Sequence, residues 1–435
     1  METTSIISPA HIYIAITIFS VLYILISLEK INKTILALIG ASLFLLSGLI
    51  SQDAAFLEHV DWNVILLLIS MMVIVGITKE SGLFQYVALK TAKITRGNPV
   101  YILILFALIT AFFSALLDNV TTVLILTPIT ILIAVELGIS PLPFVISDAI
   151  ASNIGGTATL IGDPPNIMIG SKAGLSFMQF ITNLGPVILV IITAYIAFAW
   201  LVFGRKMHVS NERRARIMEI DETKAITNKT LLIKSLIVIS LVIIGFFIHG
   251  ALGLEPATIA MAGAAILMLL TGEEEVDKFF HEVEWGTIFF FLGLFIMVGA
   301  LVEVGAIKML SQWVLKLTGG DIKLTSIVVL WFSGIFSAIV DNIPYVATMI
   351  PMIDGIGQTI GATAILPLWW SLALGACLGG NGTLVGASAN VVSAGIATKS
   401  GYKISFIEFT KYGAGFTIIS LAISMLYIMI RYVGF

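Results

Sequence analysis

Three aspartates interrupt segments that are otherwise apolar and long enough to cross a membrane. Asp118 and Asp341 each lie near the middle of such a segment, and Asp163 lies within the apolar segment 144–170. About 20 helical residues cross the hydrocarbon core of a bilayer. Ionisable groups at that depth are costly and are functional hypotheses by default. We therefore expect these three carboxylates to bind a cation or a proton, although an aspartate at the start of a helix can also serve as its cap.

The sequence around Asp163 predicts a helix that breaks inside the membrane. Residues 152–166 form the stretch SNIGGTATLIGDPPN, with three glycines and two adjacent prolines. A glycine costs about 1 kcal/mol and a proline about 3 kcal/mol in a helix interior. Interrupted apolar segments in corresponding positions of two halves point to the binding site of a transporter. The corresponding segment here is 379–390, with the sequence GGNGTLVGASAN.

The chain contains an internal repeat with a period of 223 to 224 residues. At a spacing of 223, Asp118-Asn119 aligns with Asp341-Asn342, and at 224 the two glycine-rich segments share six identities in twelve positions. Polar identities in apolar surroundings rarely arise by chance, so we infer a duplicated protein. The identical pairs join Gly155, Gly156, Thr159, Leu160, Gly162 and Asn166 to Gly379, Gly380, Thr383, Leu384, Gly386 and Asn390.

The composition places the chain in a membrane and excludes several other classes. Of its 435 residues 58% are hydrophobic and 11% are charged, whereas soluble proteins carry about 25% charged residues. Cys377 is the only cysteine, so a disulfide framework and a cysteine metal cluster are excluded. The phosphate-binding pattern GxxxxGK[ST] is absent, so transport should be driven by gradients. The sequence contains no nucleophile–base arrangement or metal-ligand spacing, and we do not expect an enzyme.

We predict an all-α polytopic membrane protein with two inverted repeats. Each repeat has five transmembrane helices and one re-entrant hairpin, and helices break near the membrane midplane. The first repeat is 1–203, the linker 204–230 is cytoplasmic, and the second repeat is 231–435. With an outside N-terminus, the segments placed inside hold 17 Lys and Arg residues and those placed outside hold 5, as the positive-inside rule requires. Spans are expected near 11–28, 34–50, 62–78, 144–170, 180–203, 231–249, 257–271, 285–302, 368–395 and 412–431, and hairpins at 99–138 and 323–360.

Neutral oxygens and amides beside the carboxylates complete the predicted site. The candidate Na⁺ ligands are Asp118, Asn119, Asp341 and Asn342, and we expect no cofactor other than Na⁺ or H⁺ as the coupling ion. Asp148 lies one turn before Asn153 on the same segment and is a weaker candidate. No Arg or Lys is expected in the core, so a multiply charged anion would need co-bound cations and helix dipoles to neutralise it. The full set of candidate substrate- or ion-binding residues is Asp118, Asn119, Asn153, Gly155, Gly156, Thr157, Thr159, Asp163, Asn166, Asp341, Asn342, Gly379, Gly380, Asn381, Thr383 and Asn390.

These motifs resemble the ion transporter superfamily, in its branch of arsenite permeases, NhaD-type Na⁺/H⁺ antiporters and the melanosomal P protein, and most of all the P-protein-like group. The resemblance covers nearly the whole chain and rests on residues 116–128, 152–166, 340–351 and 377–392. It implies an elevator-type mechanism, often in a dimer. Divalent-anion/Na⁺ symporters of the superfamily carry Ser-Asn-Thr at their hairpin tips. Asp-Asn-Val and Asp-Asn-Ile stand there in this chain, which argues against dicarboxylate transport.

The leading functional hypothesis is a proton- or Na⁺-coupled secondary active transporter of a small anion or an arsenite-like solute. The first alternative is a Na⁺/H⁺ antiporter in which the three aspartates exchange Na⁺ for protons, and the second is an anion channel. The expected partners are a small inorganic or organic solute and membrane lipids, with no nucleic acid. We expect a multi-pass protein of the cell membrane.

Overall fold

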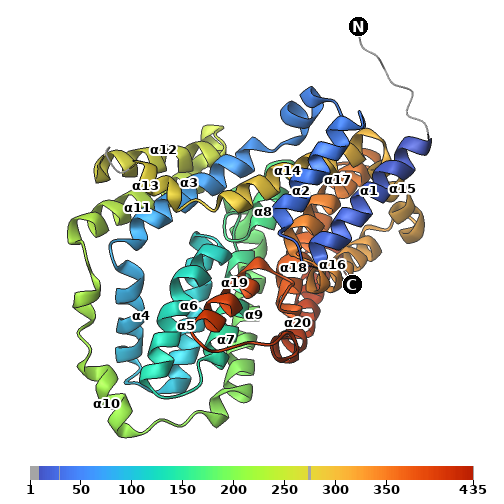
Figure 1. Cartoon of the computed structure of the whole chain (residues 1–435). Coiled ribbons are helices and arrows are strands. Elements are labelled where there is room, and N and C mark those ends of the chain that lie inside the picture. The colour runs from blue at the N-terminus through green and yellow to red at the C-terminus, as the bar shows by residue number, and fades with distance from the viewer. Residues whose placement is uncertain (1–8, 29, 273–275, 435) are drawn as a thin grey trace.

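In the computed structural model, the regular secondary structure of the described residues, 9–28, 30–272 and 276–434, is helical, and no strand occurs among them (Figure 1). Within these ranges, nine helices are long and apolar enough to cross a membrane, and the shorter helices α2 (Lys33–Leu46) and α12 (Pro256–Thr271) are also apolar. The chain is therefore a multi-pass integral membrane protein. The nine are α1 (Pro9–Ser27), α3 (Trp62–Lys79), α5 (Pro99–Leu116), α6 (Asn119–Glu136), α9 (Phe177–Val202), α11 (Lys229–Leu252), α14 (Trp285–Glu303), α16 (Ile322–Ile339) and α20 (Phe406–Ile428) with its continuation to Val433.

Two pairs of helices meet at the aspartates that were predicted to be hairpin tips. Helix α5 is followed by α6, and α16 by α17 (Asn342–Ile360), with Asp118 and Asp341 at the two turns. Asp118 has an extended backbone, with φ −156° and ψ 163°, which ends one helix and allows the next to begin. The predicted arms agree with these helices within about two residues. Whether the pairs re-enter the membrane or cross it remains a prediction.

The two predicted helix breaks are present. Helix α7 (Leu142–Thr157) stops before α8 (Pro164–Ala173), and α18 (Leu366–Gly379) stops before α19 (Ser388–Lys399). Proline is favoured in the first turn of a helix, where its missing N–H costs nothing, so Pro164 and Pro165 start α8. The second break has no proline, and α19 begins after the extended residue Ala387.

The two halves make the same hydrogen bonds at equivalent positions. Ser114 Oγ donates to the Ser152 carbonyl at 2.6 Å, and its counterpart Ser337 donates to Ala376 at 2.5 Å. Likewise Thr159 Oγ1 donates to Ala115, and Thr383 Oγ1 donates to Ala338. These bonds tie each broken helix to the first arm of its hairpin.

Glycines allow the broken helices to cross the hairpins with their backbones in contact. A Cβ atom added to Gly155 would lie 2.0 Å from the Ala111 carbonyl oxygen, and one added to Gly379 would lie 2.5 Å from that of Gly334. Small residues are typical of such close crossings between membrane helices.

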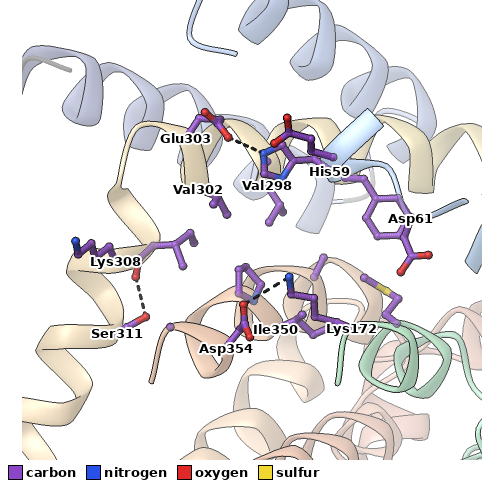
Figure 2. A pocket seen from close by; sticks show the side chains of 18 of the residues that line it. His59, Asp61, Lys172, Val298, Val302, Glu303, Lys308, Ser311, Ile350 and Asp354 are labelled. Atoms are coloured by element: carbon purple, nitrogen blue, oxygen red, sulfur yellow. Dashed lines mark hydrogen bonds and ion pairs between the residues drawn. The ribbon is translucent and has the colours of Figure 1, made fainter. Parts of the chain in front are cut away.

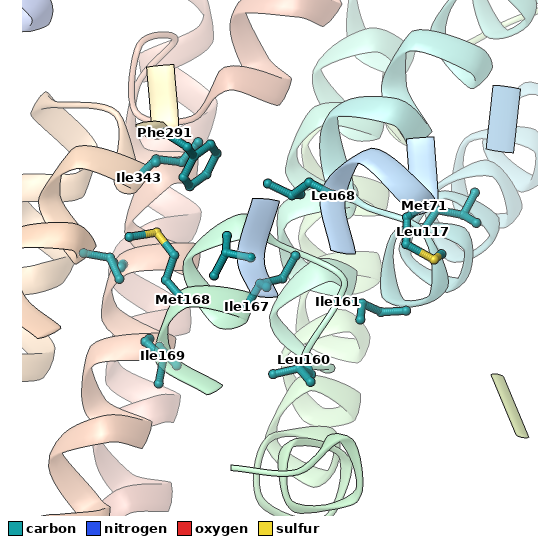
Figure 3. Packing of buried hydrophobic residues seen from close by; sticks show 14 of the residues in the cluster. Leu68, Met71, Leu117, Leu160, Ile161, Ile167, Met168, Ile169, Phe291 and Ile343 are labelled. Atoms are coloured by element: carbon teal, nitrogen blue, oxygen red, sulfur yellow. The ribbon is translucent and has the colours of Figure 1, made fainter. Parts of the chain in front are cut away.

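Each helix that resumes after a break packs against the other half of the chain. Helix α8 contacts α17 and α18, whereas α19 contacts α6 and α7, beside which Figure 1 shows it. Apolar residues of α8 and of the link before it fill the space around the first break, together with Leu68 of α3, Leu117, Phe291 of α14 and Ile343 of α17 (Figure 3). The two breaks are therefore held together by the core of the molecule.

The linker between the halves is attached to the first half. Glu222 bonds to Lys90 and Lys93 of helix α4 (Leu83–Ile94) at 3.0 and 2.6 Å. Helix α10 (Asn211–Glu219) carries Arg213, which donates to the Leu137 carbonyl at the end of α6. The remaining α-helices of the described residues are α13 (Val276–His281) and α15 (Ala306–Thr318), and a short π-helix covers Ala54–His59.

Candidate functional site

A chain of asparagine side chains connects the two breaks at the centre of the molecule. Asn119 Nδ2 donates to Asn153 Oδ1 at 2.9 Å, and Asn153 Nδ2 lies 2.9 Å from Asn381 Oδ1 and 3.0 Å from Asn390 Oδ1. All four residues are buried. Two buried polar atoms in this chain, Asn119 Oδ1 and Asn381 Nδ2, have no partner among the described residues. Buried polar groups normally find a partner, so these two atoms are candidate contacts for a ligand.

Asn166, and Asn390 of the same chain, hold the breaks open. Asn166 Nδ2 donates to the carbonyls of Gly156, Thr157 and Thr159, with the shortest contact at 2.9 Å to Thr159. Its equivalent Asn390 donates to the carbonyls of Gly380 and Thr383 at 2.8 and 2.9 Å. Both residues satisfy carbonyl groups that the breaks leave without a helical partner.

Cys377 occupies the position that is equivalent to Asn153. Its Sγ contacts Asn166 Oδ1 at 3.5 Å, just as Asn153 contacts Asn390. Each broken helix thus uses the residue at this position to contact the asparagine of the other break. From the sequence, Cys377 served only to exclude a disulfide framework and a cysteine metal cluster. Its repeat partner Asn153 was the signal that could have placed it in the site.

The three predicted carboxylates have different local roles. Asp118 accepts a hydrogen bond from the Thr121 N–H at 2.8 Å, and Asp341 accepts one from the Ile343 N–H at 3.2 Å, so both cap the helices that follow them. Asp163 stands at the start of α8 but makes no side-chain capping bond. Its two oxygens instead receive long contacts of 3.4 and 3.3 Å from Asn342 Nδ2 at the tip of the second hairpin. Asp163 is therefore aimed at the other half of the site and not at its own helix.

The expectation that no lysine or arginine reaches the core is wrong. Lys33, the first residue of α2, places its Nζ 2.6 Å from Asp341 Oδ2 and 2.8 Å from Ser388 Oγ at the start of α19. The predicted spans 11–28 and 34–50 place Lys33 in the short loop between them. Its position next to the end of a span did not reveal that Asp341, at the tip of the second hairpin, would lie beside it. The same ammonium lies 5.0 Å from the centre of the Phe290 ring.

Several other predicted residues act on the backbone in this structure. Thr157 Oγ1 donates to the Asn153 carbonyl, and Thr159 and Thr383 donate to hairpin carbonyls. Gly156 and Gly380 lie against Gly162 and Gly386 across each break, so a side chain at either position would meet the backbone. These residues shape the site, whereas the asparagines and aspartates line it.

Asp148 lies on α7 but outside this cluster. It is fully buried and is contacted by Thr110 of α5 at 3.3 Å and by Thr130 of α6. Among the described residues it forms no hydrogen bond with the asparagine chain.

Two cavities approach the site from opposite ends of α8 and α14. The smaller, of about 210 Å³, is lined by Lys33, Asp118, Pro164, Glu284 and Ser388, at the beginnings of α8 and α14. The larger, of about 990 Å³, lies at the ends of the same helices. Between the two cavities lies the buried first half of α8.

Charged side chains line the larger cavity (Figure 2). His59 Nε2 lies 2.9 Å from Glu303 Oε1, and Lys172 Nζ lies 3.5 Å from Asp354 Oδ2. Glu58 joins His59 and Glu303 in a group whose oxygen and nitrogen atoms lie within 4.8 Å of one another. The sequence spacing of the histidines had not indicated this group, because Glu303 comes from a distant helix.

Broken helices that meet at buried carboxylates and amides, with a cavity at each end, define a membrane transporter. Comparison with known proteins agrees. The family model described as citrate transporter (CitMHS) matches residues 23–375, and the chain belongs to this family.

Relatives and a solved structure extend this assignment over almost the whole chain. An uncharacterized transporter of Mycobacterium tuberculosis is 44% identical over 423 residues, which cover 96% of this chain and 98% of the relative. The P protein of Sus scrofa is 33% identical over 505 aligned positions, which cover 98% of this chain but 60% of that longer protein. The crystal structure of the YdaH transporter of Alcanivorax borkumensis has a TM-score of 0.59 at 13% sequence identity, covering 97% of this chain and 98% of that one. The fold is thus that of a known transporter.

Proposed function

We propose that this protein is a secondary active transporter in which protons or Na⁺ ions drive a small anion or an arsenite-like solute across the membrane. The observation that carries the proposal is the set of carboxylates at the hairpin tips and the first break, with Asp118 and Asp341 at the tips and Asp163 directed at Asn342. Ionisable groups inside a membrane protein mark ion pathways and proton relays. Amide oxygens and free carbonyl groups beside them are ligands suited to Na⁺.

The proposed mechanism is of the elevator type. In it, the two hairpins and the two broken helices move as one body against α2, α3 and α14. The cavities at opposite ends of α8 support this proposal, because a small displacement of α8 would open the site to one cavity and close it to the other. In the same proposal the two halves are inverted with respect to the membrane, and the linker 204–230 is cytoplasmic.

A Na⁺/H⁺ antiporter is the second candidate, and the charge of the site favours it. Lys33 is the one cation that contacts these three aspartates among the described residues, so the centre holds more acids than bases. A site of this charge attracts cations, and an anionic substrate would need co-bound cations. The antiporter differs from the leading proposal only in lacking a separate solute.

Transport by the purified protein in liposomes separates these functions. Vesicles that contain a pH-sensitive dye would be challenged in turn with Na⁺, arsenite, chloride, citrate and dicarboxylates. A pH or Na⁺-dependent signal that requires one solute supports the coupled transporter, and a pH change with Na⁺ alone supports the antiporter. Solute flux without any coupling would indicate a channel and contradict both. The double variant Asp118→Asn, Asp341→Asn serves as the matched control, because it retains the shape of the site but lacks two of its charges.

A further inference from the structure

The ammonium group of Lys33 occupies a small polar site that is made by the other half of the chain. Its Nζ lies 2.6 Å from Asp341 Oδ2 and 2.8 Å from Ser388 Oγ, and these two oxygen atoms lie 2.8 Å from each other. The face of the Phe290 ring lies 5.0 Å away. Asp341 is 8% exposed, so the charge of its carboxylate is largely withdrawn from water. A cation beside it stabilises a carboxylate that is withdrawn from water, and here the lysine supplies that cation.

The arrangement is asymmetric, although the two hairpins are equivalent. The position that corresponds to Lys33 in the second half is Pro256, which has no side-chain donor. Asp118, the counterpart of Asp341, makes no ion pair within the described part of the chain and has only its capping bond and the cavity that it shares with Lys33 and Glu284. One hairpin tip therefore carries a cation from the protein itself, whereas the other is open to a cation from solution.

The four residues of the Lys33 site come from elements that need not move together. Lys33 begins α2, which packs against α1 and α14, and Phe290 belongs to α14. Asp341 caps the start of α17, and Ser388 begins α19, which packs against α6 and α7. If the hairpins and broken helices move past α2 and α14, the oxygen atoms of Asp341 and Ser388 move with them. The ammonium of Lys33 remains with α2. The carboxylate of Asp341 is then free to accept another cation.

We infer that Asp341 and Ser388 form a binding site for a monovalent cation of the size of Na⁺, which the ammonium of Lys33 occupies in this conformation. The ammonium stands in for the ion, and the two compete for the same oxygen atoms. That the competing ion is the coupling ion rests on the proposed function. The existence of the site and the competition do not, because they follow from the contacts of Lys33.

Sodium binding to the purified protein in detergent tests this inference without any transport. The melting temperature would be followed as Na⁺ replaces choline at constant ionic strength and pH, in the parent protein and in Lys33→Met. Removal of the competitor should lower the Na⁺ concentration for half-maximal stabilisation by about tenfold, within the range typical of coupling between ligands. Lys33→Gln is a second neutral variant, in case the methionine variant does not fold.

Two controls make the result specific. Lys30→Met removes a positive charge three residues away, and it should leave the Na⁺ titration unchanged. Adding Asp341→Asn to Lys33→Met should abolish the gain in apparent Na⁺ affinity, because the carboxylate is then absent. Equal titrations of the parent and both neutral Lys33 variants, absence of Na⁺ stabilisation in all proteins, or a gain that survives Asp341→Asn would each overturn the inference. A gain in Na⁺ binding with no coupled flux in liposomes would instead contradict the proposed function and leave the cation site standing.

Discussion

The side-chain amide of Asn153 lies 3.0 Å from Oδ1 of Asn390, which is 237 residues further along the chain. The contact joins the end of α7, in the first half of the chain, to the start of α19, in the second half. Its repeat equivalent is the weaker contact between Cys377 Sγ and Asn166 Oδ1 at 3.5 Å. The two halves are thus joined by a pair of crossed contacts, of which the asparagine forms the stronger.

This difference predicts unequal effects of two substitutions. Asn153→Ala removes the partner of Asn119 Nδ2 and of the oxygen atoms of Asn381 and Asn390. Each buried polar group left unpaired costs about 1–3 kcal/mol, so we expect a strongly lowered melting temperature and loss of transport. Cys377→Ala removes the weak contacts of a thiol with Asn166 and Asp163 and should cost much less. Thermal unfolding followed by size-exclusion chromatography compares the two, and equal losses of stability would contradict the crossed-contact account.

The backbone crossings predict a second pair of effects. Gly155→Ala and Gly379→Ala each place a methyl group against a carbonyl of the neighbouring hairpin arm, as the 2.0 and 2.5 Å distances require. Overpacking of this kind costs about 1–3 kcal/mol. Gly395→Ala in α19 is the control, because nothing lies within 4 Å of its added Cβ atom. Both test variants should unfold at lower temperature than the control, and an unchanged melting temperature in Gly155→Ala would show that the crossing relaxes.

The hairpin-tip aspartates predict a loss of coupling without a loss of folding. Asparagine caps helices about as well as aspartate, so Asp118→Asn and Asp341→Asn should insert and fold normally. Each variant lacks a negative charge at the site, and apparent cation affinity should fall by about 5- to 150-fold. Liposome flux measured against Na⁺ concentration and pH gives this value. Unchanged cation dependence in both variants would reduce the two residues to helix caps.

The linker contact predicts a response to acid outside the membrane. Hydrogen bonds from Lys93, from the backbone and from Lys90 lower the pKa of Glu222 from 4.5 to about 2. Because the pKa is lower in the folded state, the contact contributes to stability in full above about pH 4.5, and its contribution is lost as the pH falls toward 2.

A nitroxide label at position 218 in α10 would report this attachment. In the parent protein it should stay immobile from neutral pH down to about pH 4 and loosen only below that. Glu222→Gln should loosen it already at neutral pH, because the amide cannot form the two ion pairs. Glu219→Gln, in the labelled helix α10, is the control. Glu219 forms no ion pair within the described residues, so its substitution should leave the label immobile. An immobile label in Glu222→Gln would mean that Arg213 and the backbone contacts suffice.

Much of this architecture could be predicted because each element has a local cause. Long apolar runs give the spans, Asp118 and Asp341 mark turns between helices, and the prolines after Asp163 start α8. The repeat then transfers each assignment from one half to the other, which is how the second break was found without a proline. The membrane boundaries of the hairpins have no such local signal, and they remain a prediction.

The missing parts of the site are those that depend on packing between distant elements. Lys33 follows a short polar loop and resembles any lysine at a membrane surface, and only the position of the second hairpin brings Asp341 to it. Ser388 was not predicted either. In the repeat its neighbour Ala387 takes the place of Asp163, and nothing local indicates that Ser388 contacts Asp341. A contact across 308 residues leaves no trace in local composition.

Asp163 supports the last prediction, which concerns the pH dependence of transport. Its carboxylate is fully buried, makes no capping bond, and is approached by Asn342 from the other half at 3.3 and 3.4 Å. If Asp163 merely capped α8, its side chain would accept a backbone N–H of that helix, and none does so. A buried acid beside an amide donor can bind a proton in one state and face a cation in another, which is what exchange requires. Asp163→Asn should therefore fold, retain solute binding and give transport that no longer varies with pH. Asp148→Asn is the matched comparison, because that acid is equally buried on α7 but is contacted by the hydroxyl groups of Thr110 and Thr130 of its own half. A pH–rate profile of Asp163→Asn that overlays that of the parent would exclude Asp163 as the titrating group.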